Sequence, residues 1–151
     1  MIKIICVGKI KESFYRESIV EYQKRLSKYT KLSIIEVPDF DSKNPSVELE
    51  KEKEFILKNI GEKEYIIALD IEGQMLDSVS FSQKLEQIYL QASTITFIIG
   101  GSSGLHPTIK EKAQYRCSFS KLTFPHQLFR ILLLEQIYRG YKIMNHESYH
   151  K

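Results

Sequence analysis

The chain of 151 residues lacks any long uninterrupted apolar run. Charges or glycines break every apolar stretch before the roughly 20 residues that span a bilayer. The opening "MIKIICVGKI" also lacks the basic start and the small-residue cleavage site of a signal peptide. These absences predict a cytoplasmic protein with no membrane contact. At 42% hydrophobic and 27% charged, the composition predicts one globular domain over residues 1–151.

Cysteine is scarce, and this excludes a disulfide framework. Cys6 and Cys117 both fall in expected strands, so we predict buried free thiols and no catalytic cysteine. The four histidines and two cysteines show none of the paired spacings that zinc sites favour, and we predict no metal. His146 and His150 are four residues apart, a spacing that is more often incidental.

The nucleotide-binding motifs with the clearest signatures are also missing. The stretch "GGSSG" at 100–104 is neither the G-x-G-x-x-G fingerprint nor a phosphate loop, which excludes the common dehydrogenase and NTPase interpretations. We do not interpret Ser102 or Ser103 as the nucleophile of a G-x-S-x-G elbow either.

Strands and helices alternate along the chain. Apolar runs predict strands at 2–7, 32–37, 65–71, 94–100 and 114–120. Apolar periodicity and capping signals predict helices at 11–28, 46–60, 80–92 and from Pro125 to about Met144. For the third helix we take Ser80 and Gln83 as a capping box. This alternation predicts an α/β fold with a largely parallel sheet and helices on both faces.

The last helix is unusual, because "LFRILLLEQIYRGYKIM" is apolar on nearly every face. A helix this apolar needs cover on more than one side. We therefore predict a homodimer formed through it.

The net charge of +3 lies entirely in residues 121–151. The cations there are Lys121, Arg130, Arg139, Lys142 and Lys151, against Glu135 and Glu147. Such a patch could meet phosphates, or it could be ordinary surface charge near a helix C-terminus. Arg130 or Arg139 could also pair with Glu135.

Three strand ends in "ALDIEGQMLDS", "IIGGSSGL" and "SFSKLTFPH" are candidates for a ligand site, because ligands bind at the carboxyl ends of parallel strands. Glycines there let the backbone approach a ligand closely. A pocket of backbone groups and apolar side chains suits an adenosine-like molecule.

These same segments resemble a known family. "IIGGSSGLH", "SFSKLTFPHQLFRILLLEQIYRGYKI" and the closing "SYHK" resemble the SPOUT-class 23S ribosomal RNA (pseudouridine-N3)-methyltransferases, the ribosomal large subunit methyltransferase H family. The resemblance covers essentially the whole chain. It implies an α/β knot with a C-terminal trefoil knot, a dimer with each active site at the subunit interface, and methylation of 23S ribosomal RNA within the assembled ribosome.

The resemblance also implies site residues. S-adenosylmethionine would contact Leu69, Gly100, Phe119, Ser120, Lys121, Leu122, Thr123 and Phe124. The tail residues Tyr149 and His150 would face the RNA, with Tyr149 stacking on the base and His150, or else His126, accepting or positioning the N3 proton. Two alternatives stay open: the tail could be a frayed terminus, and His126 could make structural hydrogen bonds at the helix N-terminus. Arg130, Arg139 and Lys142 are the candidate phosphate contacts.

The chain departs from the family at Gln74, where a lysine is usual. A contact that this lysine makes with RNA or cofactor in the family is therefore not expected in this chain. Two other functions stay open: a SPOUT methyltransferase acting on tRNA, and a non-catalytic nucleotide- or RNA-binding module.

Overall fold

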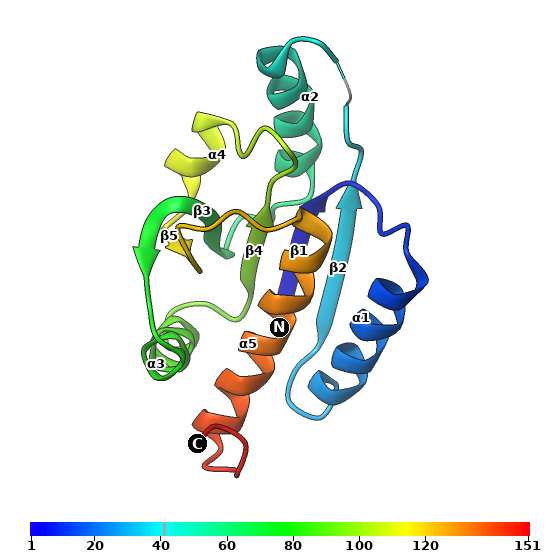
Figure 1. The fold of residues 1–151 in the computed structure, drawn as a ribbon. Helices are drawn as coiled ribbons and strands as arrows, with labels where there is room; N and C mark the ends of the chain where they lie inside the picture. The colour runs from blue at the N-terminus through cyan, green and yellow to red at the C-terminus, as the bar shows by residue number, and fades with distance from the viewer. Residues whose placement is uncertain (41) are drawn as a thin grey trace.

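A computed structural model describes residues 1–40 and 42–151 and contains one five-stranded sheet with helices on both faces (Figure 1). The strands are β1 (Ile2–Val7), β2 (Leu32–Val37), β3 (Tyr65–Met75), β4 (Ile95–Ile99) and β5 (Tyr115–Ser118). The helices are α1 (Ser13–Leu26), α2 (Pro45–Lys58), α3 (Ser78–Tyr89), α4 (Pro107–Lys112) and α5 (His126–Met144). The strand order is β2-β1-β4-β3-β5 and every pairing is parallel, which confirms the predicted α/β fold.

Alternation along the strands divides the apolar side chains between two layers. Ile4 and Cys6 of β1 belong to a core with residues from α1, α3 and α5, whereas Ile5 and Val7 belong to a core with residues from α2 and α4. Because both faces are covered, β4 is buried along its whole length, as expected for a central parallel strand.

Three local features differ from the sequence-based expectation. Helix α4 was not predicted; it begins at Pro107 after His106, whose ring Nδ1 accepts a hydrogen bond from Thr108 N at 3.0 Å. Helix α3 begins at Ser78 and is capped by Asp77, whose carboxylate accepts from Ser80 N at 2.7 Å. The capping-box assignment at Ser80 was therefore wrong, since the carboxylate three residues earlier supplies the cap.

Strand β3 is longer than predicted because it continues past a bulge. Its pairing with β5 shifts between Leu69 and Gln74, so residues 70–73 leave the ladder. A Cβ on Gly73 would lie 2.7 Å from the backbone carbonyl of Arg116, so glycine is needed where the two strands meet again. The bulge displaces residues 70–72 toward the carboxyl edge of the sheet.

Within residues 1–40 and 42–151, none of the helices combines the length and the apolarity that crossing a membrane requires.

Candidate functional site

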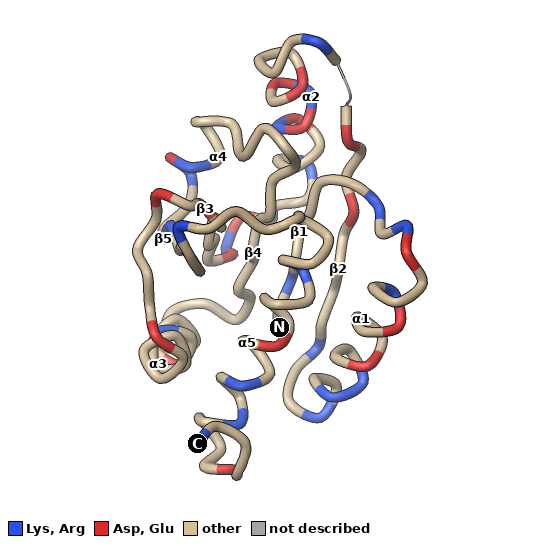
Figure 2. The backbone as a smooth tube through the Cα atoms, in the orientation of Figure 1, with Lys and Arg blue, Asp and Glu red and all other residues tan. Residues whose placement is uncertain are grey.

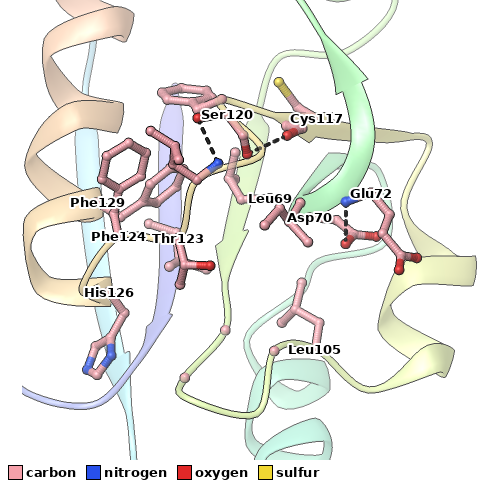
Figure 3. A pocket seen from close by; sticks show the side chains of 18 of the residues that line it. Leu69, Asp70, Glu72, Leu105, Cys117, Ser120, Thr123, Phe124, His126 and Phe129 are labelled. Carbon is pink, nitrogen blue, oxygen red and sulfur yellow. Dashed lines mark hydrogen bonds between the residues drawn. The ribbon is translucent and has the colours of Figure 1, made fainter.

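A cavity of about 330 Å³ opens at the carboxyl edge of the sheet, where β3, β4 and β5 end side by side (Figure 3). Its walls come from three segments: the end of β3 with its bulge, the glycine-rich loop after β4, and the loop between β5 and α5. The side chains that line it are mostly apolar or small. The structure thus brings together the three strand ends that the sequence indicated.

Seven of the eight residues expected to contact a cofactor line this one cavity. They are Leu69, Gly100, Phe119, Ser120, Leu122, Thr123 and Phe124. Lys121 is exposed and is not among the lining residues.

Gly100 allows the two arms of the glycine-rich loop to pack tightly against each other. An added Cβ there would lie 2.3 Å from the carbonyl oxygen of Gly104, so no other side chain fits without moving the backbone. Gly101 and Gly104 hold the turn, with Gly104 N donating to Gly101 O at 3.1 Å. The result is a wall of backbone groups that a planar ligand can approach closely.

The opposite wall is the loop between β5 and α5, which is held by hydrogen bonds within the loop. Ser118 Oγ donates to Ser120 O at 3.1 Å, and Leu122 N donates to Ser120 Oγ at 3.0 Å (Figure 3). Phe129 of α5 packs against the rings of Phe119 and Phe124, at centroid distances of 5.1 and 6.4 Å. These contacts fix the loop and give the cavity an aromatic side.

Charged side chains lie along one edge of the cavity and were not predicted. Asp70 and Glu72 come from the β3 bulge and Lys110 from α4. The Asp70 carboxylate is 4% exposed, and its Oδ2 has no hydrogen-bond partner among the described residues. An aspartate near the end of an otherwise apolar strand was the one signal in the sequence that could have indicated this edge.

A second cavity, of about 520 Å³, adjoins the first and shares Cys117, Phe119 and Phe124 with it. It also contains Asp77, Glu135 and His150. His150 therefore lines a cavity that shares part of its wall with the first one. Its Nδ1 is 3.2 Å from Arg139 Nη1, and because a guanidinium only donates, Nδ1 is the acceptor.

Tyr149 lies against its own helix. Its ring packs edge-on to Tyr138 at 5.0 Å, the Arg139 guanidinium lies 4.7 Å from the ring centre, and its hydroxyl donates to Glu135 at 3.1 Å. In this arrangement the ring is engaged within the chain. Stacking on a base requires the tail to move.

The three cations proposed for phosphate contact are all paired. Arg130 is 1% exposed, with Nη1 at 2.7 Å from Glu36 and Nη2 donating to Gly8 O at 3.1 Å. A guanidinium buried in this way does not reach a phosphate, so the placement does not support that role for Arg130.

Arg139 and Lys142 are half-buried in ion pairs near the surface. Arg139 pairs with Glu135 at 2.6 Å, one of the alternatives that the sequence left open, and Lys142 pairs with Glu147 at 2.9 Å. Figure 2 shows further lysines and arginines gathered on the C-terminal half of α1, beside this end of α5. Lys28, which follows the end of α1, contacts Glu147 at 3.4 Å.

Both cysteines are free and buried, as predicted. Burial raises the pKa of Cys6 to about 12 and that of Cys117 to about 11, so neither thiol is an active nucleophile near neutral pH. His126, at the start of α5, lines the first cavity at its far side (Figure 3). Among residues 1–40 and 42–151, no three His, Cys, Asp or Glu side chains are grouped so that they could hold a metal ion.

The fold and the cavity define an α/β protein that presents a nucleoside-sized site at the carboxyl edge of a parallel sheet. The family model described as "Predicted SPOUT methyltransferase" matches residues 1–150. The chain belongs to this family of SPOUT methyltransferases.

Curated relatives match over nearly the whole chain. A protein of Clostridium botulinum (strain 657 / Type Ba4) named "Ribosomal RNA large subunit methyltransferase H" is 52% identical, covering 99% of each chain. A protein of the same name from Caldicellulosiruptor saccharolyticus is 49% identical, covering 100% of each. A solved structure of a probable methylase family protein from Haemophilus influenzae Rd KW20 is similar in fold, with a TM-score of 0.58 at 15% identity, covering 99% of this chain and 70% of that one.

Proposed function

We propose that this protein transfers a methyl group from S-adenosylmethionine to N3 of a pseudouridine in 23S ribosomal RNA, on the assembled ribosome. The observation that carries the proposal is the convergence of Leu69, Gly100 and most of the 119–124 loop on one cavity. The names of the relatives, which specify the large-subunit ribosomal RNA, support the choice of substrate. A ribosomal substrate implies a cytoplasmic location.

The cavity residues fit an adenosine-bearing cofactor. Gly100 leaves no room for a Cβ and so allows close backbone approach, and the aromatic side formed by Phe124 and Phe129 suits an apolar ring face. When bound, S-adenosylmethionine supplies an electrophilic methyl group. The cavity walls then orient that group and exclude water from it.

The N3 proton of pseudouridine must leave during methyl transfer, and His150 is our candidate for accepting it or for positioning the base. His150 lines the cavity that adjoins the cofactor cavity, and Arg139 holds its Nδ1. In the neutral ring the proton then lies on Nε2. His150 can accept the N3 proton at Nδ1 once Arg139 releases that atom.

Replacing His150 by alanine tests this role. We expect a single-turnover methylation rate lower by about 10²- to 10⁴-fold, the usual contribution of a general base, with cofactor affinity unchanged. An unchanged single-turnover rate rejects the role for His150 and leaves His126 as the next candidate.

The proposed active form is a homodimer through α5. Leu128, Leu132 and Ile143 of this helix are only half-buried in the single chain, although they are large and apolar. A second copy would cover them, and the site with its tail residues would then lie at the subunit interface. The C-terminal trefoil knot implied by the family resemblance also remains part of this proposal.

Two measurements test the function against its alternatives. Calorimetry with S-adenosylmethionine should give a binding isotherm, whereas a plain RNA-binding module should give no heat. Mass mapping of ribosomal RNA from a deletion strain should show the loss of one methyl group from a 23S pseudouridine. A methyl group missing from tRNA instead would identify the tRNA enzyme.

A further inference from the structure

We propose that the charged edge of the cofactor cavity is a subsite for the zwitterionic amino-acid end of the ligand, in which Lys110 binds the α-carboxylate and Glu72 the α-ammonium group. This inference rests on the proposed function, since it assigns the part of the cofactor that the apolar walls do not complement.

The distribution of charge around the cavity carries the argument. The charged side chains that line the cavity all lie along the edge formed by the β3 bulge and α4. They are Asp70, Glu72 and Lys110. The other walls are glycine backbone, hydroxyl groups, apolar side chains and, at the far side, His126. A ligand with an adenosine body and a zwitterionic end has the same division between apolar and charged parts.

Lys110 is oriented by a buried carboxylate. Its Nζ lies 3.6 Å from Asp70 Oδ2, and Arg116 Nη1 lies 3.6 Å from the same oxygen. Both distances are too long for hydrogen bonds, and Oδ2 has no hydrogen-bond partner among the described residues. Asp70 therefore attracts Lys110 to the cavity edge without using its three N–H donors, which leaves them free for an anionic group.

Asp70 itself is fixed and shielded. Its Oδ1 accepts a hydrogen bond from Glu72 N at 3.2 Å across the bulge (Figure 3), and its side chain is 4% exposed. A carboxylate this buried is a positioning residue for Lys110.

Glu72 supplies the opposite charge. It is exposed, lines the cavity, and its carboxylate forms no ion pair within the described part of the chain. The bulge, closed by Gly73 against Arg116, holds Glu72 in the lining of the same cavity as Lys110. An anion and a cation with free bonding capacity thus flank one end of the cavity.

Calorimetry on the purified protein with two ligands tests the subsite without any turnover. S-adenosylhomocysteine carries the amino-acid end, and 5′-methylthioadenosine lacks it but keeps the nucleoside. We expect Lys110→Met to weaken S-adenosylhomocysteine binding about tenfold, the effect of losing one charge-assisted hydrogen bond, and to change 5′-methylthioadenosine binding less than about twofold. Glu72→Gln and Asp70→Asn should show the same selectivity.

The control is Lys112→Met, on the same helix but exposed and outside the cavity, which should change neither affinity. The subsite is overturned if Lys110→Met weakens the binding of both ligands equally, or if it weakens the binding of neither. If neither binding is weakened but the KM for ribosomes rises, Lys110 contacts RNA instead. Equal affinity of the wild-type protein for the two ligands also overturns it. Failure of the wild-type protein to bind either ligand would overturn the proposed function as well.

Discussion

Gly100 shows how one residue sets the shape of the site. A Cβ at this position would lie 2.3 Å from Gly104 O and 2.6 Å from its carbonyl carbon, and backbone atoms in a tight turn cannot move aside cheaply. The glycine is thus required by the close approach of the two arms of the loop.

We therefore expect Gly100→Ala to lower the free energy of unfolding by about 1–3 kcal/mol and to abolish measurable S-adenosylmethionine binding. Urea denaturation and calorimetry provide the two readouts. Gly61→Ala is the control for cofactor affinity, because a Cβ there meets only the side chain of Glu64, which lies outside the cavity. Unchanged cofactor affinity in Gly100→Ala would show that this wall does not contact the ligand.

Glu52 is a buried carboxylate with an unusual proton affinity. Burial, and then the nearby carboxylates of Asp39 and Glu48, raise its pKa to about 7 from an ordinary value of 4.5. The folded protein thus keeps a proton on Glu52 that the unfolded chain releases near pH 4.5. Stability contributed at this site falls as the pH rises from about 4.5 to 7.

Replacing Glu52 by glutamine should remove the loss of folding stability that deprotonation of Glu52 causes. The urea midpoint of the variant, relative to wild type, should rise between about pH 4.5 and about pH 7. The control is Glu54→Gln, an exposed position on the same helix, which should show no such trend. A midpoint difference that is independent of pH would contradict the raised pKa.

At the scale of elements, the bulge in β3 connects the sheet to the site. Residues 70–73 leave the ladder with β5, and Gly73 closes the gap by packing against the backbone of Arg116. The bulge therefore places Asp70 and Glu72 at the cavity while β5 keeps its pairing on both sides.

Gly73→Ala should strain this junction, because the added Cβ would lie 2.7 Å from backbone atoms of Arg116. We expect a loss of about 1–3 kcal/mol in the free energy of unfolding and faster amide exchange in β5. Hydrogen exchange checks the location of the effect. Wild-type exchange in β5 would mean that the bulge absorbs the change and that glycine is not needed there.

The elements also show what could be predicted from sequence. The buried strands gave strong apolar signals, and adjacent strand exits indicated the three segments that form the site. The family resemblance, not the strand pattern, singled out Leu69, Gly100 and the 119–124 loop within them. Helix α4 has six residues, too few for a periodic pattern, so Lys110 and the charged edge went unnoticed. The burial of Arg130 was equally hidden, because charge alone does not tell whether a guanidinium faces solvent or a partner such as Glu36.

At the scale of the whole molecule, the outer face of α5 determines the assembly that we propose. Sedimentation equilibrium at micromolar concentration should give twice the chain mass. Leu132→Asp should shift this to the monomer mass, because a charge would be buried without a partner in the dimer. Val20→Asp is the control, at an apolar position on α1 that is 61% exposed. A monomeric wild-type protein would contradict the dimer.

The central claim is that the cavity at the strand ends serves methyl transfer to 23S ribosomal RNA. The most direct test incubates the purified protein with S-adenosylmethionine carrying a labelled methyl group, ribosomes from a deletion strain and, separately, bulk tRNA, followed by mass mapping of the RNA. We predict one labelled methyl group on a pseudouridine of 23S RNA and none on tRNA. Label on tRNA alone, or on no RNA, would contradict the account.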